Sequence, residues 1–275
     1  DLDSGEVVAT IDIGGKPAGI ALSADGATAY VTSPEGEYLS VIDTVGHKVT
    51  RRVELAGGPL GIAVNHRTGS IYVADWFGDR LFVLNAELDV DAILPTGDSP
   101  SGVAVGPEGG IIITADRDDN QISLFDAKTH RSLGTIVVGE RPFGVTIDDA
   151  GAFAYTANVG SNDISVVDLA ARRVAATLPV GERPYAVALA GGRIFVSDQY
   201  SETVTVLDGA TYQRLAVIPV GEYPEGIAPS PDGSRVFVAN WFSNSLMEID
   251  AVALSVTREV EVGDGPRAFG AFIRP

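Results

Sequence analysis

Hydrophobic residues occur in short runs along the whole chain, and these runs recur in the same order. The clearest copy lies between Pro224 and Asp250, where an apolar run at 226–229 precedes a Ser-Pro-Asp-Gly turn. Two more β-rich runs, 235–239 and 246–250, follow on either side of a polar and aromatic loop. Short runs rich in β-branched and aromatic residues, separated by turn residues, predict a three-strand antiparallel meander.

The proline that opens this copy recurs at intervals of 40 to 42 residues, at Pro17, Pro59, Pro100, Pro142, Pro184, Pro224 and Pro266. A fourth strand with alternating charges, such as 49–55 or 256–262, completes each repeat, as expected for a strand at a sheet edge. Periods of about 40 to 45 residues with four strands are typical of β-propeller blades. We therefore predict an all-β propeller, with residues 1–275 as one domain.

The repeat also predicts how the ring closes. Six complete repeats are present, together with an outer-type strand at Val7–Ile13 and an inner-type strand at Ala268–Ile273. We predict that these two strands pair as a thin seventh blade, because an unpaired terminal strand leaves its backbone groups unsatisfied. The alternative is a six-bladed ring that closes without them. Gly102, Gly144 and Gly226 begin inner strands, where we expect a side chain to crowd the neighbouring blades.

Each third strand ends in an Asp or Asn. The six are Asp43, Asn85, Asp126, Asp168, Asp208 and Asp250. Such side chains commonly accept hydrogen bonds from their own downstream backbone in turns. We interpret them as structural and not catalytic.

The segments Ala29-Tyr30-Val31-Thr32 and Leu39-Ser40-Val41-Ile42-Asp43 resemble the repeats of YVTN-family β-propellers, bacterial and archaeal proteins of the surface-layer and YncE-like type. The resemblance extends over the whole chain and implies a seven-bladed propeller that is periplasmic or extracellular. It implies little about function, because the motif residues of the family build strands and turns. Since the sequence starts at Asp1 and not at Met, we expect an upstream segment such as a signal peptide.

Charge narrows the classes of partner. The chain has 19 Lys and Arg against 37 Asp and Glu, a net charge of −18, which repels phosphate backbones and anionic membrane surfaces. No apolar run approaches the ~18 residues of a membrane span, and the absence of cysteine excludes thiolate chemistry. We expect a monomer with no nucleic-acid partner and no membrane span.

The best candidate site lies on one face of the predicted ring. In a four-strand meander, the loops before the opening prolines and the loops between second and third strands lie on the same face, which we call the Pro-loop face. Beside the opening prolines the first three repeats carry no arginine, glutamate or aromatic residue. The later repeats carry Arg141, Phe143, Arg183, Tyr185, Tyr223, Glu225 and Arg267. A structural position would be filled alike in every blade, so this asymmetry predicts a binding site.

The composition of this set suggests its ligand. Three guanidinium groups in an acidic protein suit a carboxylate or another anionic group, while the aromatic rings could cover an apolar part of the ligand. An alternative is that Glu140, Glu182 and Glu222, in the same loops, neutralise the arginines and leave a structural network.

The loops between second and third strands add Trp76 and Trp241, which occupy the same position in two different repeats. Tyr38 and Tyr200 stand on neighbouring loops. An indole is costly to expose, so these residues predict a surface for a ligand or protein partner. The alternative is that each indole packs over its own blade.

Catalysis has weaker support in the sequence. His47, His66 and His130 are all expected on the opposite face, which counts against histidine-dependent chemistry. A metal-dependent lactonase or lyase could use Glu225 with Asn158, Asp198 or Asn240, although Asn or Asp at that strand end belongs to the structural pattern of the family. The acidic loop at 116–120 lacks the glycine and spacing of a Ca²⁺ loop.

We therefore predict a non-enzymatic binding module with no catalytic residue, metal or cofactor. Its ligand is a small molecule, for which an anionic group would suit the arginines, or a protein. The metal-dependent enzyme is the alternative.

Overall fold

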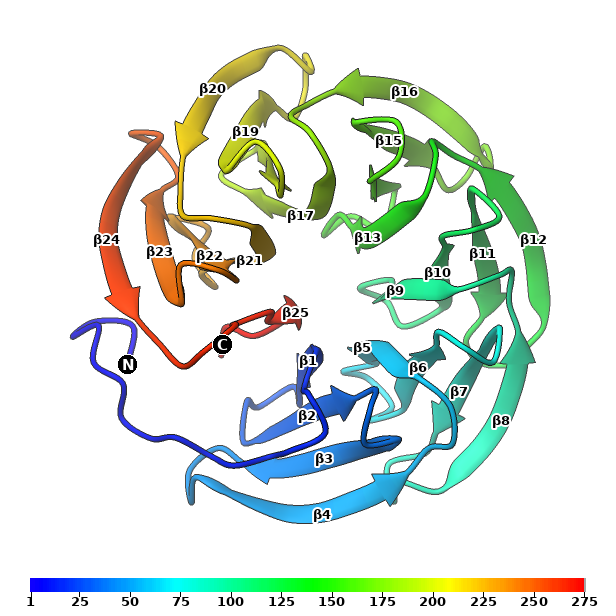
Figure 1. Ribbon diagram of the computed structural model, residues 1–275. Coiled ribbons are helices and arrows are strands. Elements are labelled where there is room, and N and C mark those ends of the chain that lie inside the picture. The colour runs from blue at the N-terminus through cyan, green and yellow to red at the C-terminus, as the bar shows by residue number, and fades with distance from the viewer. Residues whose placement is uncertain (275) are drawn as a thin grey trace.

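The computed structural model describes residues 1–274, in which antiparallel four-stranded sheets are arranged as blades around a central axis (Figure 1). Blade one contains β1 (Gly19–Leu22), β2 (Thr28–Ser33), β3 (Tyr38–Asp43) and β4 (Lys48–Glu54), and blade two contains β5 (Pro59–Val64), β6 (Ile71–Asp75), β7 (Arg80–Leu84) and β8 (Val90–Pro95). Blade three contains β9 (Pro100–Val105), β10 (Ile111–Asp116), β11 (Gln121–Asp126) and β12 (Ser132–Val137).

The second half of the chain repeats this arrangement. Blade four contains β13 (Pro142–Ile147), β14 (Phe153–Asn158), β15 (Asp163–Asp168) and β16 (Arg173–Pro179), and blade five contains β17 (Pro184–Ala190), β18 (Arg193–Asp198), β19 (Thr203–Asp208) and β20 (Arg214–Pro219). Blade six contains β21 (Pro224–Pro229), β22 (Arg235–Asn240), β23 (Ser245–Asp250) and β24 (Ser255–Glu261), and is followed by the two-residue β25 (Phe269–Gly270). The predicted propeller and its six complete repeats are confirmed.

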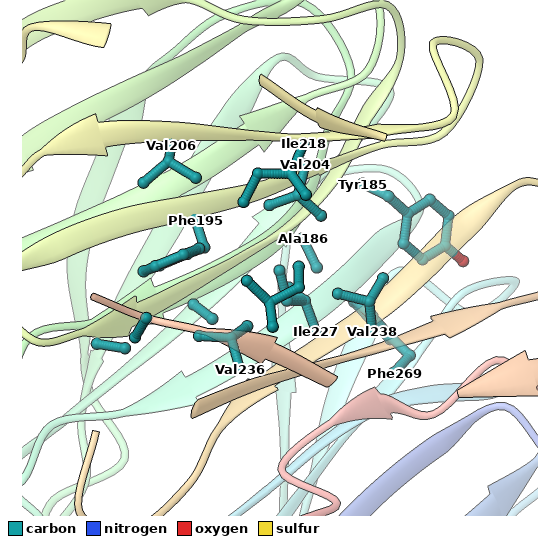
Figure 2. Close-up of a cluster of buried hydrophobic side chains, with 14 residues drawn as sticks. Tyr185, Ala186, Phe195, Val204, Val206, Ile218, Ile227, Val236, Val238 and Phe269 are labelled. Carbon is teal, nitrogen blue, oxygen red and sulfur yellow. The ribbon is translucent and has the colours of Figure 1, made fainter. Parts of the chain in front are cut away.

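The blades are held together by apolar side chains that lie between neighbouring sheets. Leu39 and Val41 of blade one pack in one cluster with Ile71 and Val73 of blade two, and Leu39 and Ile71 are fully buried. Another cluster joins blades five and six through residues such as Phe195 and Ile227 (Figure 2). Because these two clusters draw on neighbouring sheets, the blades concerned share their cores.

The Asp and Asn residues that end the third strands behave as predicted. Asp43 accepts hydrogen bonds from the backbone N–H groups of Val45 (3.0 Å) and Gly46 (2.9 Å). Asp250 does the same for Val252 (2.8 Å) and Ala253 (2.7 Å). These side chains replace backbone partners in a tight turn, which explains their recurrence without any role in a site.

The innermost strands form a ring of seven, because β25 lies between β21 and β1 (Figure 1). β25 pairs with β1 in parallel, with Phe269 opposite Gly19 and Gly270 opposite Ile20. Inner strands of neighbouring blades all run in the same direction from the Pro-loop face, so a bond between two of them is parallel. The result is a five-stranded mixed sheet, β25-β1-β2-β3-β4, that closes the ring.

The predicted pairing of Val7–Ile13 with Ala268–Ile273 was wrong. Residues 7–13 form no strand, and β25 bonds to β1 instead. An outer strand and an inner strand of one blade are three strand spacings apart, about 14 Å, because the second and third strands lie between them. The N-terminal segment stays at the outer rim and the C-terminal strand stays near the axis, and the two therefore do not meet.

The N-terminal segment instead forms a strap along the rim between blades six and one (Figure 1). At one end, Arg258 Nη1 donates to the carbonyl oxygen of Asp3 (3.1 Å). At the other end, Arg52 Nη2 and the Tyr38 hydroxyl both donate to the carbonyl oxygen of Ile13 (2.8 Å each). The strap thus bridges the sector in which a complete seventh blade would stand.

Blade six is adapted to this thin neighbour. Its third strand carries Glu248 at the position where the other five blades have Val41, Val83, Leu124, Val166 and Val206. Glu248 is buried and accepts a hydrogen bond from Arg258 Nη2 (3.0 Å). A charged pair replaces an apolar contact here because no full sheet packs against this face.

Candidate functional site

Two sets of hydrogen bonds fix the backbone of the Pro-loop face. The backbone N–H groups of Arg141 and Arg183 donate to the side-chain oxygens of Asn120 and Asn162 in the preceding blade, each at 2.8 Å. Both arginines have a left-handed backbone, with φ of 52° and 55°. This conformation is unfavourable for residues with a Cβ, and the contact with the preceding blade holds it in place.

The second set involves an Asp or Asn at the end of the second strand in blades two to six: Asp75, Asp116, Asn158, Asp198 and Asn240, all fully buried. Asp198 accepts hydrogen bonds from the Thr205 hydroxyl (2.6 Å) and the Gly181 N–H (3.0 Å), and burial raises the pKa of its carboxyl to about 6. Asn158 bonds to Ser165 (2.9 Å) and Asn240 to Ser245 (3.1 Å), within their own blades.

The residues considered above as metal ligands therefore have structural roles in separate parts of the ring. Asn158, Asp198 and Asn240 hold strands and loops of separate blades, and Glu225 lies at the start of an inner strand. Within residues 1–274, no three His, Asp or Glu side chains gather as potential metal ligands.

Three aromatic rings meet across the channel at the Pro-loop face, and we call them the channel plug: Phe143, Tyr185 and Phe269. The Phe143 ring lies 4.3 Å from Tyr185 and 5.0 Å from Phe269, measured between centroids. Their strands β13 and β25 are three places apart in the ring of seven, so the Phe143–Phe269 contact spans the axis. In Figure 2 the Tyr185 hydroxyl points away from the buried cluster.

Trp76 belongs to the edge of this plug. Its ring centroid is 5.9 Å from that of Phe143, and the Arg117 guanidinium lies 5.5 Å above it. The predicted residues Trp76, Phe143 and Tyr185 are therefore brought together. Phe269 was not predicted, because its partner lies on the far side of the ring and no local pattern indicates it.

A second aromatic group lies over blades five and six, and we call it the aromatic ridge: Tyr200, Tyr223, Trp241 and Phe242. Tyr223 lies 5.4 Å from Tyr200 and 4.4 Å from Phe242, and Trp241 stacks on Phe242 at 4.6 Å. Tyr200 and Phe242 are 50% and 52% exposed. With two of its four rings half exposed, the ridge lies at the surface of the protein and not in a core.

Two of the three predicted arginines lie on this ridge. The Arg183 guanidinium is 4.6 Å from the Tyr200 ring centre and donates to the Tyr200 hydroxyl (2.9 Å). The Arg267 guanidinium is 4.5 Å from the Trp241 ring. Arg141 is exposed, and within residues 1–274 it contacts no aromatic ring in this way.

Glu225 lies beneath the two arginines, with only 1% of its surface exposed. Its Oε1 accepts a hydrogen bond from Gln199 Nε2 (2.8 Å), and its Oε2 is 3.9 Å from Arg267 Nε. Burial raises the pKa of the Glu225 carboxyl to about 7, although Arg267 and the Gln199 amide act in the opposite direction. Glu140, Glu182 and Glu222, suggested above as neutralising partners, are exposed and form none of the ion pairs within residues 1–274.

The opposite side of the same face is acidic. Asp79, Asp98, Asp118 and Asp119 gather over blades two and three, and repulsion from Asp119, Asp79 and Asp118 raises the pKa of the Asp98 carboxyl. The exposed aromatic rings of the Pro-loop face therefore lie over blades five and six, where Arg183 and Arg267 stand near the exposed Glu182 and Glu222, and the four aspartates lie over blades two and three.

The channel below the plug contains a cavity of about 390 Å³. Its wall consists largely of Ala, Val, Ile, Leu and Gly side chains of the inner strands, and His66 and Asp149 stand among its lining residues. The small residues at the starts of the inner strands therefore let neighbouring inner strands approach one another closely. They also leave free space along the axis. Sequence reasoning did not predict it, because the free volume depends on the number of strands around the axis.

The fold and the site define the chain as a β-propeller repeat protein with an aromatic and arginine-bearing face. Among solved structures it is similar to a chain of Kuenenia stuttgartiensis hydrazine synthase, with a TM-score of 0.83 and 20% identity over 95% of this chain and 91% of the other. It is also similar to a functionally unknown protein from Desulfotomaculum acetoxidans, with a TM-score of 0.82 and 17% identity over 98% and 94%.

These identities establish the propeller fold alone. No protein-family profile matches the sequence, and no curated protein matches it. No helix within residues 1–274 is long and apolar enough to cross a membrane.

Proposed function

We propose that the chain is a non-enzymatic binding module that engages a protein partner through the aromatic ridge. The observation that carries the proposal is the exposure of Tyr200 and Phe242 beside two arginines on one side of a single face. Tyr, Trp, Phe and Arg are the side chains enriched at the centres of protein interfaces. The ridge lies on loops and exposes about half of Tyr200 and Phe242, which suits a macromolecular partner better than an enclosed small molecule.

Charge indicates the chemistry of the partner. The chain has a net charge of −18, yet Arg183 and Arg267 lie on the ridge with aromatic rings beneath them. A partner surface with apolar side chains and at least one carboxylate would complement this patch, while the acidic side of the face would repel an acidic partner that docked there. The orientation of the bound partner would follow from this difference between the two sides of the face.

We further propose that the chain is a YVTN-type propeller of seven blades with a reduced seventh blade, located in the periplasm or outside the cell. The motif at 29–43 and the ring of seven inner strands support the assignment. The periplasmic or extracellular location rests on the same resemblance.

Selection of displayed peptides on the immobilised protein would test the ridge. We expect selected peptides to lose about 30-fold in affinity for the Phe242→Ala variant, because truncating a central interface aromatic typically costs about 2 kcal/mol. Phe77 offers a matched control, since it occupies the same position in blade two and is 74% exposed. Phe77→Ala should leave affinity unchanged.

The proposal would be wrong if the selected peptides bound Phe242→Ala as tightly as the parent, or if Phe77→Ala weakened them equally. Melting temperatures of both variants should remain close to that of the parent, because both side chains are more than half exposed.

A further inference from the structure

Three charged groups from different segments lie close together at the aromatic ridge. Glu225 comes from the start of β21, Arg183 from the loop before β17, and Arg267 from the segment between β24 and β25. Arg267 Nε lies 3.9 Å from Glu225 Oε2, and the charge of Arg183 acts on the same carboxylate. The cluster carries one net positive charge when Glu225 is ionised and two when it is protonated.

The hydrogen bonds of this cluster are incomplete. Glu225 Oε2 and Arg183 Nε are buried, and within residues 1–274 neither has a hydrogen-bond partner. An unpaired buried polar group costs about 1–3 kcal/mol. Meanwhile both guanidinium heads rest on aromatic rings, in positions from which they can reach a group bound on the ridge.

The surroundings of Glu225 show which groups act on its charge. Arg267 faces it from the segment after β24, Tyr185 from β17, Arg183 from the loop before β17, and the neutral Gln199 from the loop after β18. Burial outweighs the attraction of both arginines and raises the pKa of its carboxyl to about 7. The two protonation states are therefore both accessible between pH 6 and pH 8.

We propose that Arg183 and Arg267 form a carboxylate-binding subsite within the aromatic ridge, in which Glu225 competes with the incoming carboxylate until it takes up a proton. The inference rests on the ridge as the binding surface and adds the ligand class and its regulation. The bound carboxylate is either that of a small aromatic acid or an Asp or Glu side chain of a partner protein.

The direction of the effect follows from charge. Below pH 7 Glu225 is neutral, and both guanidiniums are available to the ligand. Above pH 7 the Glu225 carboxylate offsets one of their two positive charges and repels a second carboxylate. A ligand carboxylate with an ordinary pKa near 4 stays ionised throughout this range. Binding should therefore draw about half a proton from solution at pH 7 and close to one at pH 8.

Titration calorimetry with benzoate and with an acidic hexapeptide would test the subsite and separate the two ligand sources. We expect the parent protein to bind the preferred carboxylate about 10-fold more tightly at pH 6 than at pH 8. The neutral analogue benzamide should bind equally weakly at both values. Measurement in two buffers of different ionisation enthalpy should reveal proton uptake at pH 8.

Glu225→Gln is the decisive variant, because it keeps the acceptor for Gln199 and removes the charge. It should bind at pH 8 as tightly as the parent does at pH 6, with no proton uptake. Glu222→Gln, an exposed change in the neighbouring loop, should behave as the parent does. Arg267→Gln should abolish the affinity for carboxylates at both pH values, and it provides a second test if Glu225→Gln fails to fold.

The inference is overturned if no carboxylate binds at either pH, if Glu225→Gln retains the pH dependence, or if Arg267→Gln binds normally. Histidines on the opposite face cannot imitate the effect, since their titration would persist in Glu225→Gln. Failure of the subsite is distinguishable from failure of the ridge. Peptides that lose affinity in Phe242→Ala but bind equally at pH 6 and pH 8 would support the ridge as a binding surface and contradict the carboxylate subsite.

Discussion

Replacing Gly61 with alanine should lower the free energy of unfolding by more than about 3 kcal/mol, the upper end of the usual range for overpacking. A Cβ at this position would lie 1.9 Å from the carbonyl oxygen of Ser101 and 3.1 Å from the Cα of Gly102. Both are backbone atoms of the next inner strand. They cannot withdraw unless β9 moves, and β9 is itself packed against β13.

The measurement is chemical denaturation of Gly61→Ala beside Gly110→Ala. Gly110 has no atom within 4 Å of an added Cβ and provides the matched control for the loss of a glycine. The control should remain within about 1 kcal/mol of the parent, as expected for the entropic effect of the exchange alone. Equal stabilities for the two variants would show that the inner strands do not approach as closely as described.

Replacing Asp198 with asparagine should stabilise the protein by about 3 kcal/mol above pH 7, at about 1.4 kcal/mol per unit of pKa shift. Burial raises the pKa of this carboxyl from 3.8 to about 6, so the folded protein holds a proton that the unfolded chain releases near pH 4. The stability of the parent therefore falls as pH rises from about 4 to 6, and the full penalty remains at higher pH. Asparagine carries no charge and avoids the penalty.

The difference in stability between Asp198→Asn and the parent should depend on pH over the same range. Stability of Asp198→Asn and of the parent should converge near pH 4, where the aspartate is protonated in both the folded and the unfolded state, and should diverge up to pH 7. Asn158 and Asn240 occupy the same blade position and demonstrate that an amide fits there. The reciprocal change Asn240→Asp should destabilise the protein above pH 6. A pH-independent difference between Asp198→Asn and the parent would contradict the assignment.

The sequence by itself determined the architecture of the individual blade. The opening prolines gave the period, the alternation of apolar residues gave the four strands, and the Asp and Asn residues ended the third strands as turns. These features depend on neighbours within about 20 residues, and short-range patterns record such neighbours directly. The glycines at 102, 144 and 226 were also understood, since an added Cβ would meet backbone oxygens at 2.5, 2.6 and 2.2 Å.

Only the tertiary structure decided how the ring closes and what lies together on the Pro-loop face. The asymmetry of the opening loops identified Arg183, Tyr185, Glu225 and Arg267, but not that Glu225 is buried beneath the arginines. Phe269 reaches Phe143 across the axis, and the N-terminal segment forms a strap where a paired strand was predicted. A repeated sequence specifies every blade in the same way. Contacts across the axis and between the two ends of the chain depend on the number and width of all units together, and no single repeat contains that information.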